Sequence, residues 1–120
     1  MTTLTPKPLT SQTFYRGATF RGRLPVTVPD GTAKDLTGAA VRWGLLKSDD
    51  TLALPESALG SGVSFEGSPT LGVLVITVLD SDTATLPEVE LTQEWVITDG
   101  VGDVQIYRGR VFVADSELPA

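Results

Sequence analysis

The chain has 120 residues, enough for one domain with its own hydrophobic core and too few for a second. It contains no cysteine and no histidine, which excludes disulfides, thiolate nucleophiles, histidine general bases and the commonest zinc ligands. Fifteen acidic against nine basic residues give a formal net charge of −6, so the chain repels a phosphate backbone. We therefore expect no nucleic-acid partner and no cofactor.

The sequence has no segment that reads as a membrane span or a secretory signal. Its longest purely apolar stretch, Val73 to Ile76, is far too short to cross a bilayer. The residues after Met1 lack a basic region leading into an apolar one. We expect a soluble protein that is made in a cytoplasm and has no membrane partner.

Residues 1–11 predict an extended N-terminal arm, because they contain two prolines, no aromatic residue and no helical or strand periodicity. The arm has three sizeable apolar side chains, Met1, Leu4 and Leu9. These are too few to offset the backbone entropy lost on ordering, which is about 1–2 kcal/mol per residue. We expect the arm to be mobile in the isolated chain and ordered only against a neighbouring protein, with Lys7 reaching an acidic patch there.

The segment from residue 20 to residue 28 predicts a half-buried strand, because apolar and polar residues alternate along it. Phe20 and Leu24 belong to the inward face. Pro25 belongs to the polar face and cannot donate a hydrogen bond to a neighbouring strand. The strand is therefore expected either to lie at the edge of a sheet or to break at Pro25.

Six further segments, separated by turns rich in glycine, proline and aspartate, have the composition of short strands: residues 39–46, 51–54, 60–67, 73–79, 91–98 and 103–113. Residues 73–79 are apolar on both faces, which is typical of a strand inside a sheet. Trp43 and Trp95 fall at inward positions and are expected in the core. Residues 80–86 predict one helical turn.

About seven short strands without an amphipathic helix predict an all-β fold, an immunoglobulin-like antiparallel β-sandwich. The sandwich should cover residues 12–114 and be followed by a polar tail, residues 115–120.

Three blocks of sequence carry a resemblance to a known family. They are Arg16–Phe20, then Asp35–Trp43, then Asp82–Pro87 followed by a strand, an Asp-Gly hairpin and a closing strand that ends in Arg-Gly-Arg-Val. Their order and spacing resemble the immunoglobulin-like N-terminal domain of baseplate upper proteins from tailed bacteriophages. The chain departs from the family at Ala18, where an acidic residue is usual, and it has none of the long C-terminal extension of larger members.

The resemblance implies a non-enzymatic structural protein of a phage particle. Such a protein would be an adaptor or decoration module that binds other virion proteins and is oligomeric within the particle. The resemblance favours the tail or baseplate, while a capsid decoration role is equally compatible with a rigid sandwich. The alternative is a carbohydrate-binding or host-recognition module, which would need exposed aromatic residues; the candidates are Phe14, Tyr15 and Tyr107.

Close pairs of carboxylates are the only catalytic parts in the sequence: Asp49 with Asp50, Asp80 with Asp82, and Glu88 with Glu90. Two carboxylates can hydrolyse a glycoside, but each pair falls in a predicted turn, where acidic side chains ordinarily accept backbone hydrogen bonds. Calcium at Asp80 and Asp82 stays an alternative, although no glycine and glutamate follow at EF-hand spacing. We expect turn residues here and no enzyme.

Arg108 and Arg110 share one face of the last predicted strand. They either cover apolar surface with their aliphatic stems or anchor a partner, since arginine forms bidentate contacts with carboxylates. The candidate partner interface therefore comprises Lys7, Tyr15, Arg108 and Arg110.

Overall fold

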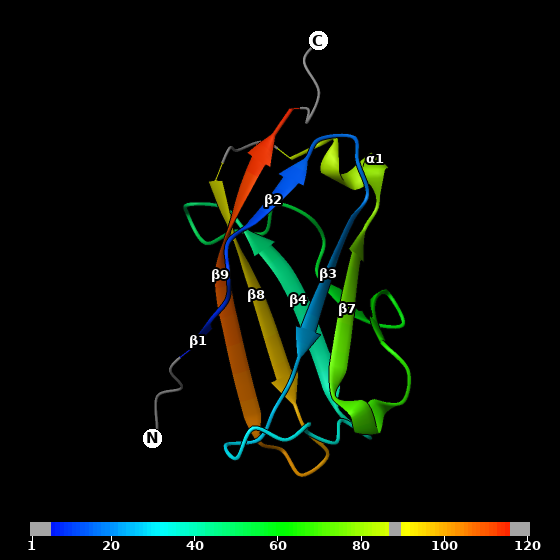
Figure 1. Ribbon diagram of the computed structural model, residues 1–120. Helices are drawn as coiled ribbons and strands as arrows, with labels where there is room; N and C mark the ends of the chain where they lie inside the picture. Colours follow the sequence, from blue (N-terminus) through cyan, green and yellow to red (C-terminus); the bar gives the residue numbers. More distant parts are fainter. Residues whose placement is uncertain (1–5, 87–89, 116–120) are drawn as a thin grey trace.

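A computed structural model describes residues 6–86 and 90–115 of the protein (Figure 1). Within these ranges the regular secondary structure is almost entirely β-strand, with one short helix and one 3₁₀ turn. The elements are β1 Lys7–Pro8, β2 Gln12–Tyr15, β3 Phe20–Pro25, β4 Ala40–Leu46, β5 Ser57–Leu59, β6 Gly62–Phe65, η1 Pro69–Leu71, β7 Val73–Val78, α1 Asp80–Thr83, β8 Glu90–Thr98 and β9 Val104–Ala114.

The strands follow the order β1-β9-β8-β4-β5-β6-β7-β3, and β2 also pairs with β9. The path curls into two layers, one built around β9, β8 and β4 and the other around β6, β7 and β3 (Figure 1). The short strand β5 pairs with β4 on one side and β6 on the other, so it links the layers. This all-β, immunoglobulin-like sandwich confirms the predicted fold class.

The alternation of apolar and polar residues sets which face of each strand is buried. Along β8, Leu91, Gln93, Trp95 and Ile97 are buried and the residues between them are more exposed. The predicted strand 73–79 corresponds to β7, which lies between β6 and β3. The predicted edge strand corresponds to β3, which ends the strand order and contains Pro25. Both of these placements are confirmed.

Aromatic rings fill the space between the layers. Trp43 and Trp95 are each 2% exposed and face each other edge to face across β4 and β8, with ring centroids 6.5 Å apart. The ring of Phe14 stacks on that of Phe20 at 4.0 Å and lies 6.4 Å from that of Trp43. The Trp43 Nε1–H group donates to Gln93 Oε1 at 3.1 Å. The predicted core position of both tryptophans is confirmed.

The predicted strand at residues 51–54 is wrong, because only Leu52 forms a bridge there, to Leu46. A tight turn stabilised by Asp49 reverses the chain before it, and the sheet resumes beyond Pro55 with β5. The sequence Ser-Ala-Leu of β5 is too short to show a period.

The N-terminal arm is partly incorporated into the sheet. β1 pairs in parallel with β9, and the Leu9 N–H donates to the Arg108 carbonyl at 2.8 Å. The expectation of a mobile arm is therefore wrong for residues 7–9, whereas residues 1–5 lie outside the described ranges. Backbone hydrogen bonds and the packing of Leu9 against the core supply the stabilisation that the arm's apolar content could not.

The buried position of Trp95 predicts how removal of its ring changes the stability of the protein. Trp95→Ala should lower the free energy of unfolding by about 3–5 kcal/mol, as expected for a buried large aromatic side chain. Chemical denaturation measures this loss. Val101→Ala is the matched control, since Val101 is 85% exposed and should change stability by less than about 0.5 kcal/mol. A loss under about 1 kcal/mol for Trp95→Ala would contradict its place in the core.

A contact between Leu9, the residue after β1, and Gly109 predicts how the arm contributes to stability. An added Cβ at Gly109 would lie 2.6 Å from Leu9 Cβ and 3.1 Å from the Leu9 carbonyl oxygen. We expect Gly109→Ala to destabilise the full chain by about 1–3 kcal/mol. In a chain lacking residues 1–11 the same substitution should change stability by less than about 0.5 kcal/mol, since the clashing atoms are gone. Equal losses in both backgrounds would show that the arm does not pack on β9.

Candidate functional site

The outer face of the β4, β8 and β9 layer carries cross-strand ion pairs. We call the outward residues of these strands, with Glu56 beside them, the ladder face. The Arg108 guanidinium pairs with the Glu94 carboxylate directly opposite it. Arg110 Nε lies 3.5 Å from Glu90 Oε1. A third pair joins Arg42 Nη1 to Glu56 Oε1 at 3.6 Å.

These ion pairs are too exposed to be important for stability. The Arg110 side chain is 70% exposed and that of Arg108 is 48% exposed. Exposed ion pairs typically contribute about 0.2–1 kcal/mol each. Phe112, also 41% exposed, points to the same side of β9 as the two arginines. The face thus presents arginine and aromatic groups, the residue types enriched at protein interfaces.

The structure brings together three of the four residues predicted as a partner interface. Arg108 and Arg110 lie on the ladder face, and Tyr15 pairs with Ala114, which places this half-buried tyrosine on the same side of the layer. Lys7 lies away from the ladder face, on β1, where it pairs with Tyr107 of β9. Its Nζ atom is 5.4 Å from the centre of the Tyr107 ring. The interface role of all four residues stays a prediction.

Sequence reasoning missed the glutamates that pair with the arginines. The signal was available in the Asp99–Gly100 hairpin, because a hairpin centred near residue 101 sets Glu94 opposite Arg108. Residue alternation places Phe112 on the arginine face, but its exposure depends on how far β2 and β8 cover it, which periodicity does not reveal.

Three aspartates stabilise turns, and one of them, Asp49, belongs to the carboxylate pairs for which this role was predicted. Each accepts, through Oδ1, hydrogen bonds from the hydroxyl and the backbone N–H of a threonine two residues later. They are Asp30, Asp35 and Asp49. The threonine hydroxyl, followed by the backbone N–H, lowers the pKa of each carboxyl below its ordinary value.

Two of the other paired carboxylates have partners within the chain. Asp80 Oδ1 accepts a hydrogen bond from the Ser81 N–H, and Glu90 pairs with Arg110. Glu88 lies outside the described residues. Within residues 6–86 and 90–115, no three His, Cys, Asp or Glu side chains are grouped so that they could hold a metal ion. In the same ranges, no helix is both long and apolar enough for a membrane span.

A shielded ion pair fixes one end of the sandwich. Lys34 Nζ lies 2.9 Å from Asp99 Oδ2, and their side chains are only 17% and 7% exposed. Asp99 Oδ1 also accepts hydrogen bonds from the N–H groups of Val101 at 3.0 Å and Asp103 at 2.9 Å. The Lys34 hydrogen bond is the main cause that lowers the Asp99 pKa, and burial opposes it. The pair ties the loop before β4 to the β8–β9 hairpin.

The sequence blocks that carry the family resemblance form hydrogen bonds and packing contacts that connect separate segments of the sandwich. The Gly17 N–H donates to Thr83 Oγ1 at 3.1 Å, and the Thr83 hydroxyl donates to the Ala18 carbonyl at 2.9 Å. Arg16 Nε donates to the Leu86 carbonyl at 3.0 Å. The first and third blocks therefore hold each other at one end of the sandwich.

The middle block, Asp35–Trp43, also connects two segments of the sandwich. Its Leu36 is fully buried, and the Leu36 N–H donates to the Pro69 carbonyl at 3.0 Å. Gly38 adopts a φ of 75°, a conformation that favours glycine. The block thus packs the turn before β4 against η1.

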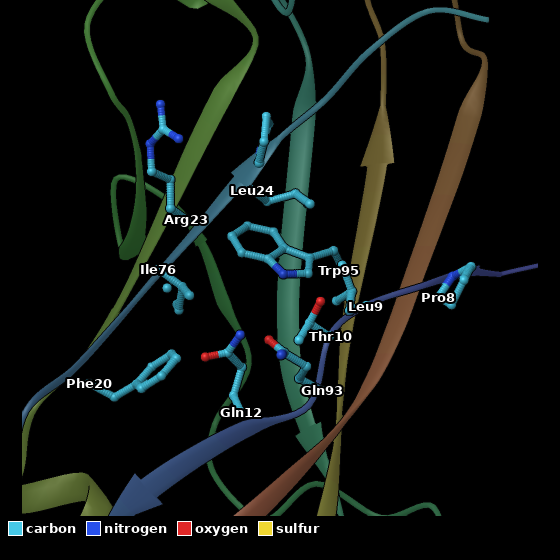
Figure 2. Close-up of a pocket in the computed structure, with 12 residues that line it drawn as sticks. Pro8, Leu9, Thr10, Gln12, Phe20, Arg23, Leu24, Ile76, Gln93 and Trp95 are labelled. Atoms are coloured by element: carbon cyan, nitrogen blue, oxygen red, sulfur yellow. The ribbon is translucent and has the colours of Figure 1, made fainter. Parts of the chain in front are cut away.

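A groove opens at one side of the sandwich, between β3 and the chain that runs from β1 to β2 (Figure 2). Its volume is about 250 Å³. Its apolar lining includes Leu9, Phe20, Leu24, Ile76 and Trp95, and its polar lining includes Gln12 and Gln93. We call it the lateral groove.

No protein-family model matches the chain, and no curated protein sequence matches it. Among solved structures, the chain is similar to the crystal structure of CopC from Methylosinus trichosporium OB3b, with a TM-score of 0.52 and 12% sequence identity. The match covers 92% of this chain and 89% of that one. At this identity the likeness shows the fold alone, and it agrees with the β-sandwich described above.

The shielded ion pair predicts a pH effect. A lowered pKa means that ionised Asp99 contributes stability above its ordinary value of 3.8, and that this contribution is lost as the pH falls through its folded-state pKa. Asp99→Asn should therefore lower the melting temperature at pH 7, with a difference from wild type that shrinks below about pH 4. Melting curves from pH 2 to 7 measure this.

The exposed Asp50 provides the control for this measurement, because asparagine tolerates its positive φ of 64°. Asp50→Asn should stay within about 0.5 kcal/mol of wild type at pH 7. A difference between wild type and Asp99→Asn that did not change with pH would show that the ionised pair contributes nothing.

Proposed function

We propose that this chain is a non-enzymatic structural module of a tailed bacteriophage particle, an adaptor or decoration protein that binds other virion proteins through its ladder face. The observation that carries the binding role is the grouping of Arg108, Arg110 and Phe112 on one exposed sheet face. The particle itself is proposed from the resemblance of the three sequence blocks to the baseplate family.

The physical character of the ladder face supports contact with a protein. Its arginines offer planar groups to a partner's carboxylates, and their present ion pairs are exposed enough to be exchanged. Phe112 supplies an apolar side chain among them. A rigid sheet holds these groups in place without the entropy cost of ordering a loop.

The positions of the aromatic residues disfavour the carbohydrate-binding alternative. Sugar recognition through stacking needs exposed rings, but Phe14 is fully buried and Tyr107 is 7% exposed. Tyr15 is half-buried at the end of β2. Among the residues first considered for that role, none therefore offers a fully open ring.

Locating the chain in intact particles tests the particle assignment. Cross-linking followed by mass spectrometry should join residues near Arg108 and Arg110 to a second virion protein. Absence of the chain from purified particles would refute the proposal.

A charge reversal tests the ladder face itself. Arg110→Glu should reduce incorporation into particles by about tenfold or more, as expected for loss of an interface arginine. Its melting temperature should stay near that of wild type, because its ion pair is exposed. Lys47→Glu reverses one charge outside the ladder face and should assemble normally. Normal incorporation of Arg110→Glu would exclude the ladder face as the binding surface.

A further inference from the structure

One edge of β3 is open to an additional strand. The Val26 N–H donates to the Gly72 carbonyl at 2.7 Å, which continues the antiparallel register between β3 and β7. Hydrogen-bonded pairs alternate in such a register, so Phe20, Gly22 and Leu24 bond to β7. The backbone groups of Arg21 and Arg23 point the other way. In the part of the chain that the structure describes, no strand pairs with them.

The lateral groove lies directly beside this open edge (Figure 2). Its volume of about 250 Å³ is below the range of roughly 300–1,000 Å³ that is usual for small-molecule sites. A cavity of about 150 Å³ already holds a benzene-sized group. The groove therefore suits a single large apolar side chain, with Leu24, Ile76 and Trp95 as its apolar walls.

The charge on β3 selects what can pair with it. Arg21 and Arg23 project from the outer side of the strand and are exposed. Antiparallel pairing of β3 with β3 of another copy would place arginines opposite arginines, which is unfavourable. Arg23 pairs with Glu66, but both side chains are more than half exposed, so an incoming carboxylate can share the guanidinium. The edge thus favours an acidic strand.

The residues after β9 have the matching pattern. In an extended segment, Glu117 and Leu118 point to opposite faces, because the side-chain period of a strand is two. If Glu117 lies beside the arginines of β3, Leu118 points into the lateral groove. We propose that residues 116–120 of one copy add as a strand to β3 of a second copy in this way.

Geometry favours a second copy over the same chain. Asp115 is held at the end of β9, where its Oδ1 lies 2.5 Å from Arg16 Nη1. From β9 to the open edge of β3, the segment would cross about one strand spacing and one sheet spacing, roughly 15 Å in all. Glu117 is only two residues beyond Asp115, about 7 Å of extended chain, so within the same copy it could not lie beside Arg21 and Arg23. In a second copy the segment can lie along the strand, and the contact joins copies head to tail.

Sedimentation of the full chain against a chain lacking residues 116–120 tests the proposal. The full chain should associate as concentration rises, more weakly at high salt, whereas the truncated chain should stay monomeric at every concentration. Hydrogen exchange gives a direct readout, because the Arg21 and Arg23 amides should become protected only when the copies associate. Equal association of both chains, or a full chain that stays monomeric at millimolar concentration, would overturn the proposal.

Binding of a synthetic peptide of residues 115–120 tests the proposed pairing between this segment and β3. It should bind the truncated chain, and Arg23→Glu should weaken this binding by roughly tenfold. A peptide with Glu117→Arg should restore binding to the Arg23→Glu chain. Arg42→Glu, on the opposite layer, is the matched control and should bind the original peptide normally.

Two further results would also contradict the proposal. A monomeric full chain whose β3 amides are already protected would show docking within one copy. Peptide binding that Arg23→Glu leaves unchanged would place the segment elsewhere. Neither result bears on incorporation into particles, so the proposed function can fail or stand separately.

Discussion

A column of rings through the interior is the interaction on which the rest of the structure depends. Phe20 stacks on Phe14, whose ring lies near Trp43, which in turn meets Trp95 edge to face. The rings come from β3, β2, β4 and β8, so they join the two layers without any disulfide. Aromatic pairs of this kind contribute beyond their buried area. The outer faces can carry exposed charges because this interior holds the layers together.

The elements that the sequence predicts well are those whose burial follows a local period. Leu91–Ile97 alternates cleanly, and the inward positions of Trp95 and Ile97 follow from residue spacing alone. The Asp99–Gly100 turn likewise sets the register of β9 on β8. Such features depend on neighbours in the chain, so a single sequence contains them.

The features that the sequence does not predict depend on contacts between distant residues. Leu9 is held by the carbonyl of Arg108 and packs over Gly109, and neither contact leaves a pattern near residue 9. The strand β5 is defined by its neighbours β4 and β6 rather than by its own three residues. Prediction of the ion pairs on the ladder face requires the register between neighbouring strands as well as the residue types. The lateral groove needs both layers in place before it exists.

The residues that carry the family resemblance mostly stabilise turns and strand contacts, although the closing Arg-Gly-Arg-Val also supplies Arg108 and Arg110 to the ladder face. The blocks place Thr83, Leu36 and Gly38 in turns and in contacts between segments. Such blocks therefore indicate how the sandwich is held together. Function depends on the binding surfaces that a fold presents, and it can change while the fold stays constant. Here the ladder face belongs to the β4, β8 and β9 layer, whereas the open edge belongs to β3 in the other layer. Because the two surfaces belong to different layers, a strand bound at β3 does not cover Arg108 or Arg110, and a module of this design can contact its own copies and another protein at once.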